Sequence, residues 1–134
     1  MTYGVVQQIE FCYGHRLFGY QGKCAHPHGH NAVAHITIES KNINSNGMVV
    51  DFTEIKKILQ SWIDETLDHR MILHKDDPLV AALEKLGEPI VKIDTAPTVE
   101  YIAQMIFEYA QKKNFPVQEV RLWGSPSHCA YYRG

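Results

Sequence analysis

The stretch Cys24-Ala-His-Pro-His-Gly-His30-Asn-Ala-Val-Ala-His-Ile-Thr-Ile-Glu39 joins a cluster of histidines to an alternating apolar segment. The alternation over residues 32–39 predicts a half-buried β-strand. His28 and His30 are two residues apart, so on a strand their rings point to one face, whereas on a helix they would diverge. The sequence therefore predicts a strand carrying two imidazoles that can bind one metal ion, and zinc suits nitrogen ligands of this kind.

A catalytic zinc ion usually takes three protein ligands and keeps a fourth position open, so a third ligand is needed. His15 is the best candidate among the eight histidines, because it follows an alternating run over residues 5–14 that would pair with the strand after His30. His26 alternates away from that pair. Solvated loop histidines are the competing interpretation of a bare His-x-His. Cys24 could complete a structural Cys-His site, but a Cys-x-x-Cys partner is absent, so we interpret it as a reactive thiol.

The remaining pattern predicts further strands and helices. Helices are expected over residues 51–68 and 97–114, and strands over residues 117–123 and 129–133. Residues 74–94 between the helices are expected to be irregular, apart from one short strand at residues 89–93. This order predicts an α+β fold in which a four-stranded antiparallel sheet carries two helices on one face. So short a chain has little to cover the edges of that sheet, which favours oligomerisation.

Composition limits the class of protein. The 134 residues, 45% of them hydrophobic and 21% charged, suit a single domain over residues 1–134 with one core. The net charge of -2 comes without the basic stripe that nucleic-acid binding requires, and no apolar run approaches the roughly 20 residues of a membrane span. Three cysteines cannot all pair, and no signal-like segment opens the chain, which favours a cytoplasmic protein with Cys24 free. Cys12 and Cys129 are expected to be small buried residues.

The residues near the predicted metal suit proton transfer beside a carbonyl group. Zinc is a Lewis acid that polarises an oxygen atom and acidifies a bound hydroxyl. Cys24 is a candidate base, since a thiolate is favoured beside positive charge from a metal or from His26. Asp68 and His69 are candidates to supply or relay a second proton. An ordinary helix end is the alternative for this pair, because histidine is favoured there and neighbours on a helix do not share a face.

Several motifs resemble those of a known enzyme family. Phe11-Cys-Tyr-Gly-His15-Arg-Leu is similar to its Phe-x-Ala-x-His-x-Leu, Cys24-x-x-x-His28-Gly-His30-Asn31 to its Cys-x-x-x-His-Gly-His-Asn, and Gly47-Met-Val-Val-Asp51-Phe52 to its Gly-Met-Val-x-Asp-Phe. Leu67-Asp68-His69, Asp77-Pro-Leu79 and Pro97-Thr98-x-Glu100 follow in the family's order. The family is that of 6-pyruvoyltetrahydropterin synthase and 6-carboxytetrahydropterin synthase, and the similarity runs over almost the whole chain.

This resemblance implies a fold and an oligomer. Members of the family have the T-fold, in which sheets join edge to edge into a barrel, commonly of three subunits, and two such rings often stack into a hexamer. Their active sites lie between subunits. On this basis the protein is expected to be a homotrimer or homohexamer, and an isolated monomer is expected to lack a complete site.

The resemblance also implies a reaction. The family's substrate is 7,8-dihydroneopterin triphosphate, from which triphosphate is eliminated. One branch yields 6-pyruvoyltetrahydropterin, and the other also cleaves the side chain to give 6-carboxytetrahydropterin and acetaldehyde for the queuosine pathway. This short chain looks more like the bacterial carboxy branch. The matching positions are the zinc ligands His15, His28 and His30, the proton acceptor Cys24, and the proton relay Asp68 and His69.

One departure from the family pattern lies near the C-terminus. Members usually have Glu-Thr there, with the Glu accepting hydrogen bonds from the pterin, but counting back from the final Tyr132-Arg-Gly aligns Gly124 and Ser125 with these positions. Loss of this acceptor would weaken pterin binding by about 2 to 5 kcal/mol if the donors stay unpaired. Thr98 and Glu100 have two open interpretations, which are helix capping and contact with the substrate.

Three functional hypotheses remain. The first is a zinc enzyme acting on a dihydropterin triphosphate, which is favoured because the matched chemical positions are all retained. The second is a divergent zinc-binding relative with a different substrate or ligand, which the missing Glu indicates. A structural-zinc interaction module would explain the three histidines, but it leaves Cys24 and the Asp68-His69 pair without a role.

Overall fold

A long antiparallel hairpin forms the centre of the fold. In the computed structural model, which describes residues 1–134, β1 (Tyr3–His15) pairs along its whole length with β2 (His28–Ser40). The register runs without a bulge from the Tyr3–Ser40 pair to the His15–His28 pair. Because alternate side chains of a strand point to opposite faces, one face of the hairpin is buried in the core. The two predicted N-terminal strands are therefore confirmed.

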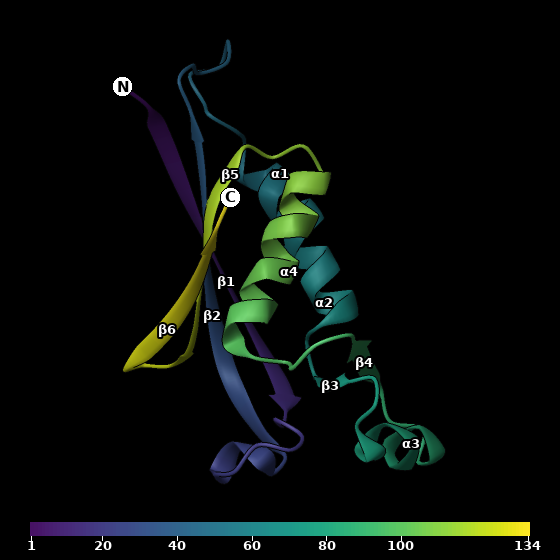
Figure 1. Ribbon diagram of the computed structural model, residues 1–134. Helices are drawn as coiled ribbons and strands as arrows, with labels where there is room; N and C mark the ends of the chain where they lie inside the picture. The colour runs from purple at the N-terminus through teal and green to yellow at the C-terminus, as the bar shows by residue number, and fades with distance from the viewer.

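Four further strands complete a six-stranded sheet in the order β4-β3-β1-β2-β5-β6 (Figure 1). They are β3 (Arg70–His74), β4 (Ile90–Ile93), β5 (Val117–Ser125) and β6 (His128–Arg133). The predicted four-stranded antiparallel arrangement is present as β1, β2, β5 and β6. The short strands β3 and β4 continue the sheet on the other side of β1 in parallel orientation, so the sheet is wider than predicted.

The main helices cover one face of the sheet and leave the other face open (Figure 1). A continuous helix runs through α1 (Phe52–Ile55), a π-helical segment η2 (Lys56–Gln60) and α2 (Ser61–Thr66), and α4 (Val99–Lys112) lies beside it. These helices and the sheet enclose a core of 22 buried residues, whose removal from water favours folding. Both predicted helices are confirmed, with slightly shorter ends. None of the helices combines the length and hydrophobicity that crossing a membrane requires.

A short helix, α3 (Pro78–Lys85), lies in the segment that the sequence predicts to be irregular. The carboxylate of Asp77 caps this helix by accepting a hydrogen bond from the backbone N–H of Leu79 at 2.8 Å. Pro78 occupies the start of the helix, where a proline is favoured because its missing N–H is not needed. The irregular prediction is therefore wrong at α3, whereas the short strand expected at residues 89–93 is confirmed as β4.

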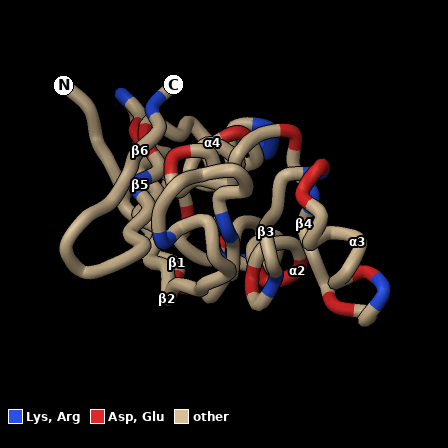
Figure 2. Tube along the Cα trace, turned by 60° about the horizontal axis from the view of Figure 1, so that its bottom comes forward, with Lys and Arg blue, Asp and Glu red and all other residues tan.

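Ion pairs differ in how deeply they are buried. Figure 2 shows Lys and Arg interspersed with Asp and Glu along the trace. In the ion pair between Lys92 and Glu84, which are 3.1 Å apart, about half of each side chain is exposed. The side chain of Asp77 is 0% exposed, and Arg16 donates to both of its carboxylate oxygens. This pair joins the end of β1 to the start of α3. The hydrogen bond from Arg16 holds the pKa of Asp77 below its ordinary value, although burial opposes the shift.

Replacing Arg16 by Ala would leave a buried carboxylate without its partner. We therefore expect Arg16→Ala to lower the free energy of unfolding by about 3 to 5 kcal/mol. The control Lys92→Ala, which removes an exposed pair, should cost about 0 to 1 kcal/mol. Denaturant titration followed by circular dichroism measures both changes, and equal losses from the two variants would contradict the assignment. Because the pKa of Asp77 is depressed, its stabilisation is present at neutral pH and is lost as acid protonates the carboxylate.

Candidate metal centre

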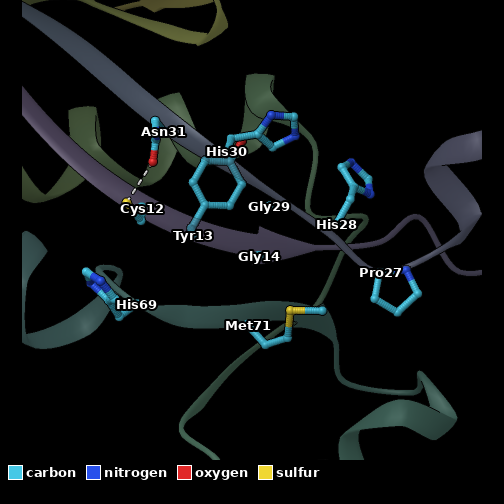
Figure 3. Close-up of a pocket in the computed structure, with 10 residues that line it drawn as sticks. All are labelled: Cys12, Tyr13, Gly14, Pro27, His28, Gly29, His30, Asn31, His69 and Met71. Atoms are coloured by element: carbon cyan, nitrogen blue, oxygen red, sulfur yellow. Dashed lines mark hydrogen bonds between the residues drawn. The ribbon is translucent and has the colours of Figure 1, made fainter.

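Three imidazoles meet where the β1–β2 hairpin begins to close. His15 is the last residue of β1 and pairs with His28, the first residue of β2, while His30 projects from β2 to the same side as His28 (Figure 3). Their ligand nitrogens all lie within 4.8 Å of one another, and the Nε2 atoms of His15 and His30 are 3.0 Å apart. His15 is buried and the other two are half-buried. The structure therefore brings together the three histidines that were predicted as ligands.

Each of these rings is oriented through its Nδ1 atom by a backbone carbonyl. His15 Nδ1 lies 2.6 Å from Pro97 O, His28 Nδ1 lies 2.7 Å from His26 O, and His30 Nδ1 lies 3.0 Å from Gly124 O. A carbonyl oxygen can only accept, so each Nδ1 carries the proton and each Nε2 keeps its lone pair. Metal-binding histidines are typically held in this way through the nitrogen that does not touch the metal.

This set of donors fits a zinc ion. Nitrogen ligands about 2.0 to 2.1 Å from a tetrahedral ion lie about 3.3 Å from one another, and the 3.0 Å between the nitrogens of His15 and His30 is close to that separation. Burial lowers the pKa of His15 to about 4, although the hydrogen bond to Pro97 opposes the shift, and the nearby rings of His28 and His30 lower this pKa further. His15 is therefore neutral at physiological pH, which is the form that binds metal.

Tyr13 is a buried neighbour of these rings that the sequence analysis did not single out. It pairs with His30 across the hairpin, and its ring centroid lies 5.1 Å from that of His15 and 5.4 Å from that of His30. Its hydroxyl group is buried without a hydrogen-bond partner, and burial raises its pKa. The sequence does mark Tyr13 as unusual, because it stands where the family pattern has Ala, two residues before His15.

The start of α4 reaches the metal centre through its backbone. The Thr98 hydroxyl accepts a hydrogen bond from the N–H of Tyr101 at 3.2 Å and caps the helix. Pro97, the residue before this cap, supplies the carbonyl that orients His15. The capping interpretation of Thr98 is therefore confirmed, and the cap also positions a group that holds a candidate ligand.

Asp68 and His69 form a hydrogen-bonded pair where the first helix ends. His69 Nδ1 lies 2.8 Å from Asp68 Oδ2. Neighbouring residues on a helix do not face one another, but the chain leaves the helix here, and His69 has a left-handed φ of 59°. Burial acts to raise the pKa of Asp68, but hydrogen bonds from the backbone N–H of Cys12 and from His69 outweigh it, so this pKa lies below its ordinary value. Asp68 is therefore a carboxylate that can stabilise a protonated His69.

Cys24 lies in the connection between the two strands of the hairpin. It occupies a short 3-10 helix, η1 (Lys23–Ala25), and is exposed. The backbone of this segment is held by a hydrogen bond of 2.7 Å from the N–H of Leu17 to the carbonyl of Cys24. Cys24 belongs neither to the three-histidine group nor to the group that contains Asp68. The predicted base and the predicted relay are therefore not clustered within one chain.

Cys12 is the thiol that lies beside Asp68 and His69. The sequence analysis treats it as a small buried residue, but it is half-buried, because it alternates with the core residues Phe11 and Tyr13 and so belongs to the other face of β1. Its sulfur and one ligand atom each of Asp68 and His69 lie within 4.8 Å of one another. The alternation of side chains along β1 indicates that Cys12 lies on the face opposite to Phe11 and Tyr13.

Gly124, which stands where the family has its Glu, adjoins the metal centre directly. Its carbonyl oxygen accepts the hydrogen bond from His30. A Cβ atom added to Gly124 would lie 3.6 Å from His30 Nδ1 and 3.7 Å from Val99 Cγ2, which is ordinary van der Waals contact. A side chain at this position is therefore sterically acceptable, and the glycine is not required by crowding.

A cavity of about 230 Å³ opens beside Gly124. Its lining includes Ser125, His128 and His30, together with the carboxylate-bearing side chain of Glu100 in the first turn of α4. The cavity therefore keeps one acidic side chain on its wall in the absence of the family's Glu. This arrangement favours contact with a ligand as the second interpretation of Glu100.

The chain is similar in sequence and in structure to known proteins. Relatives from Rickettsia bellii and Rickettsia felis, both named 6-carboxy-5,6,7,8-tetrahydropterin synthase, are 36% and 38% identical over 128 residues, which cover 90% of this chain and 93% of each relative. A solved structure of an uncharacterized protein from Wolinella succinogenes matches with a TM-score of 0.86 at 26% identity, covering 100% of this chain and 99% of that chain.

The fold is also that of an enzyme in the solved structures. Caenorhabditis elegans 6-pyruvoyl tetrahydropterin synthase superposes with a TM-score of 0.73 at 24% identity, covering 100% of this chain and 96% of that chain. The expected T-fold is therefore confirmed. The family model described as 6-pyruvoyl tetrahydropterin synthase matches residues 4–134. From its first β-strand to its last residue, the chain belongs to the 6-pyruvoyl tetrahydropterin synthase family.

Proposed function

We propose that this protein is a zinc-dependent tetrahydropterin synthase, a carbon-oxygen lyase that eliminates triphosphate from 7,8-dihydroneopterin triphosphate. The observation that carries the proposal is the group of three imidazoles whose Nδ1 atoms are all held by backbone carbonyls and whose Nε2 lone pairs are left free. Family membership over residues 4–134 supports the reaction class.

The proposed product is 6-carboxytetrahydropterin, which would place the protein in the queuosine pathway. Relatives at 36% and 38% identity carry the name 6-carboxy-5,6,7,8-tetrahydropterin synthase. The relative from Pongo abelii named 6-pyruvoyl tetrahydrobiopterin synthase is 28% identical. The higher identity to the first group favours the carboxy branch.

Specific side chains would carry the proton transfers. A zinc ion held by His15, His28 and His30 would polarise the oxygen atoms that it binds. Cys24 would accept a proton from the substrate as a thiolate. His69 donates its Nδ1 proton to Asp68 and keeps the Nε2 lone pair, so it can take up a second proton while the carboxylate stabilises the resulting charge.

The complete site would form between subunits of a cytoplasmic homotrimer or homohexamer. Cys24 and the Asp68-His69 pair belong to different parts of the chain and are not clustered with one another. The sheet ends in two unpaired edge strands, β4 and β6. Edge strands of this kind can pair with a second copy of the chain. Such pairing would bring the relay of one subunit toward the thiol and metal centre of its neighbour.

Removal of one imidazole should abolish both turnover and metal binding at the three-histidine centre. We expect His28→Ala to lose one equivalent of zinc, because only two of the three ligands of this centre remain. The matched control is His35→Ala, on the same strand but on its other face, where His35 contacts Gln8 at 3.1 Å. Elemental analysis of the purified variants measures the zinc. Full retention of zinc by His28→Ala would contradict the ligand assignment.

The reaction itself is tested with the zinc-loaded protein and 7,8-dihydroneopterin triphosphate. We expect release of triphosphate and a pterin product with the mass of 6-carboxytetrahydropterin. Cys24→Ala should keep its zinc but stop turnover, because the proposed base is removed while the three imidazoles stay in place. Release of zinc from Cys24→Ala would instead identify this thiol as a ligand. A wild-type protein that binds zinc and does not turn over would contradict the proposed substrate.

A second candidate function is favoured by Gly124. The family's carboxylate is missing from the cavity beside His30, and Glu100 is the acidic side chain on its wall. A ligand with fewer or differently placed N–H donors than a pterin would suit such a site, because buried donors without an acceptor are costly. On this view the protein keeps the metal centre and binds or transforms a different small molecule.

Restoring the carboxylate distinguishes these two functions. If the hydrogen bonds between a carboxylate and the pterin ring have been lost, Gly124→Glu should tighten binding of 7,8-dihydroneopterin by about 10- to 100-fold. The reason is that a charged acceptor would again meet the N–H donors of the ring. Gly124→Gln is the matched control, with the same size and no charge. Isothermal titration calorimetry measures both affinities. No gain over the control would show that another group, such as Glu100, already fills this role.

A further inference from the structure

A second group of metal-binding side chains lies on the face of β1 that points away from the core. Cys12, Asp68 and His69 each place one ligand atom within 4.8 Å of the others. The Cys12 thiol donates a hydrogen bond to Oδ1 of Asn31, with a sulfur-to-oxygen distance of 2.9 Å, and a dashed line marks this bond in Figure 3. We propose that Cys12, Asp68 and His69, with Asn31 as the fourth ligand, form a second site for a divalent ion of the zinc class. It shares no ligand with the three-histidine centre.

The backbone holds this group together before any ion binds. The N–H of Cys12 donates to Asp68 Oδ1 at 2.9 Å, and the N–H of His69 donates to the carbonyl of Cys12 at 2.7 Å. These two bonds fasten the turn that carries Asp68 and His69 to one residue of β1. His69 also keeps a φ of 59°, a conformation that is uncommon for residues other than glycine and needs such support. The side chains are therefore positioned by their main chains.

The donor types indicate the class of metal. A thiolate, an imidazole, a carboxylate oxygen and an amide oxygen make a mixed set that suits zinc or cobalt, whereas magnesium and calcium prefer oxygen alone. Ligands about 2.0 to 2.3 Å from a tetrahedral zinc ion lie about 3.3 to 3.8 Å from one another. The present separations of up to 4.8 Å need only a small contraction. The side chain of His69 is 77% exposed and is free to make that adjustment.

Binding exchanges one proton for the metal. In the structure the Cys12 thiol donates its proton to Asn31, and the Nδ1 proton of His69 is donated to Asp68. Asp68 is already a carboxylate, and the Nδ1 proton of His69 moves through solvent to Nε2, so that the Nδ1 lone pair, which faces Asp68, becomes free to bind the ion. Only the thiol proton must therefore leave, and it passes to solvent as the Cys12 thiolate bonds to the ion. Solvent reaches the group through cavities of about 560 Å³ and 430 Å³, both of which are lined by Cys12, Asn31 and His69.

Occupation of this second site has a consequence that rests on the proposed function. Asp68 and His69 are also the proposed proton relay. An ion bound to both of them would remove the lone pair that accepts the proton. Zinc beyond the first equivalent would therefore inhibit turnover while the three-histidine centre stays filled.

Cobalt titration of the metal-free protein tests the site without reference to activity. The three-histidine centre contains no sulfur, so a sulfur-to-cobalt charge-transfer band in the near ultraviolet reports a thiolate ligand. We expect two equivalents of cobalt to bind, with this band accompanying one of them. A folded wild-type protein that binds cobalt without the band would overturn the proposal.

Four variants assign the band to its residues. Cys12→Ser should abolish it and leave one bound equivalent, whereas the matched control Cys24→Ser should retain both. His69→Gly permits the positive φ but removes the imidazole. It should lower the affinity for the cobalt ion that gives the charge-transfer band by at least about tenfold. His28→Ala should lose the other equivalent and keep the band, so failure of the proposed function would not alter this result. Loss of the band in Cys24→Ser but not in Cys12→Ser would place the sulfur ligand elsewhere and overturn the proposal.

Discussion

The register of the β1–β2 hairpin is the constraint on which the rest of this structure depends. Thirteen consecutive pairs run from Tyr3–Ser40 to His15–His28 without a bulge. Because side chains alternate, a slip of one residue would carry His28 and His30 to the open face and leave His15 alone in the core. The apolar side chains that share the buried face resist such a slip, since it would expose them as well. The same packing that stabilises the sheet therefore brings together the three imidazoles of the candidate metal centre.

The three imidazoles depend on packing in a second way. The carbonyl groups that orient them belong to the loop before β2, to the residue before the α4 cap and to β5. The start of α4 and strand β5 are brought to the hairpin by the core between the helices and the sheet, whereas the His26 carbonyl is local to His28. A metal site built on rigid elements with a supporting hydrogen-bond shell keeps its geometry better than one on a flexible loop. Here the shell is entirely backbone, so it persists through changes in the neighbouring side chains.

Strand β1 separates two kinds of chemistry on its two faces. Its core face carries His15 beside the buried Tyr13, and its other face carries Cys12 beside Asp68 and His69. Gly124 belongs to the first of these regions, since its carbonyl holds His30 and its missing side chain leaves room in the adjoining cavity. A different residue at this position would change the wall of the cavity and leave the orientation of His30 intact, because the backbone of Gly124 holds His30 while only a side chain would enter the cavity.

Local pattern was sufficient for much of the fold. Alternation predicted the hairpin and the two closing strands, and helical spacing predicted both long helices. The His-x-His spacing together with the pairing of β1 selected the three histidines that the structure brings together. Pattern failed at α3, which Pro78 starts within the segment predicted to be irregular. It also failed at β3, a short strand held by parallel pairing with β1 and β4. Short segments of this kind are decided by what they pack against, which local propensity does not contain.

The sequence by itself determined which side chains are candidates for the chemistry, because residue type and strand spacing are written in it. Only the tertiary structure decided which groups support them. His15 is oriented by a carbonyl 82 residues away and His30 by one 94 residues away, and Cys12 meets Asp68 across 56 residues. Every residue has a backbone carbonyl, so no sequence pattern marks the ones that will face a ligand. Packing of α4 and β5 against the hairpin makes that selection.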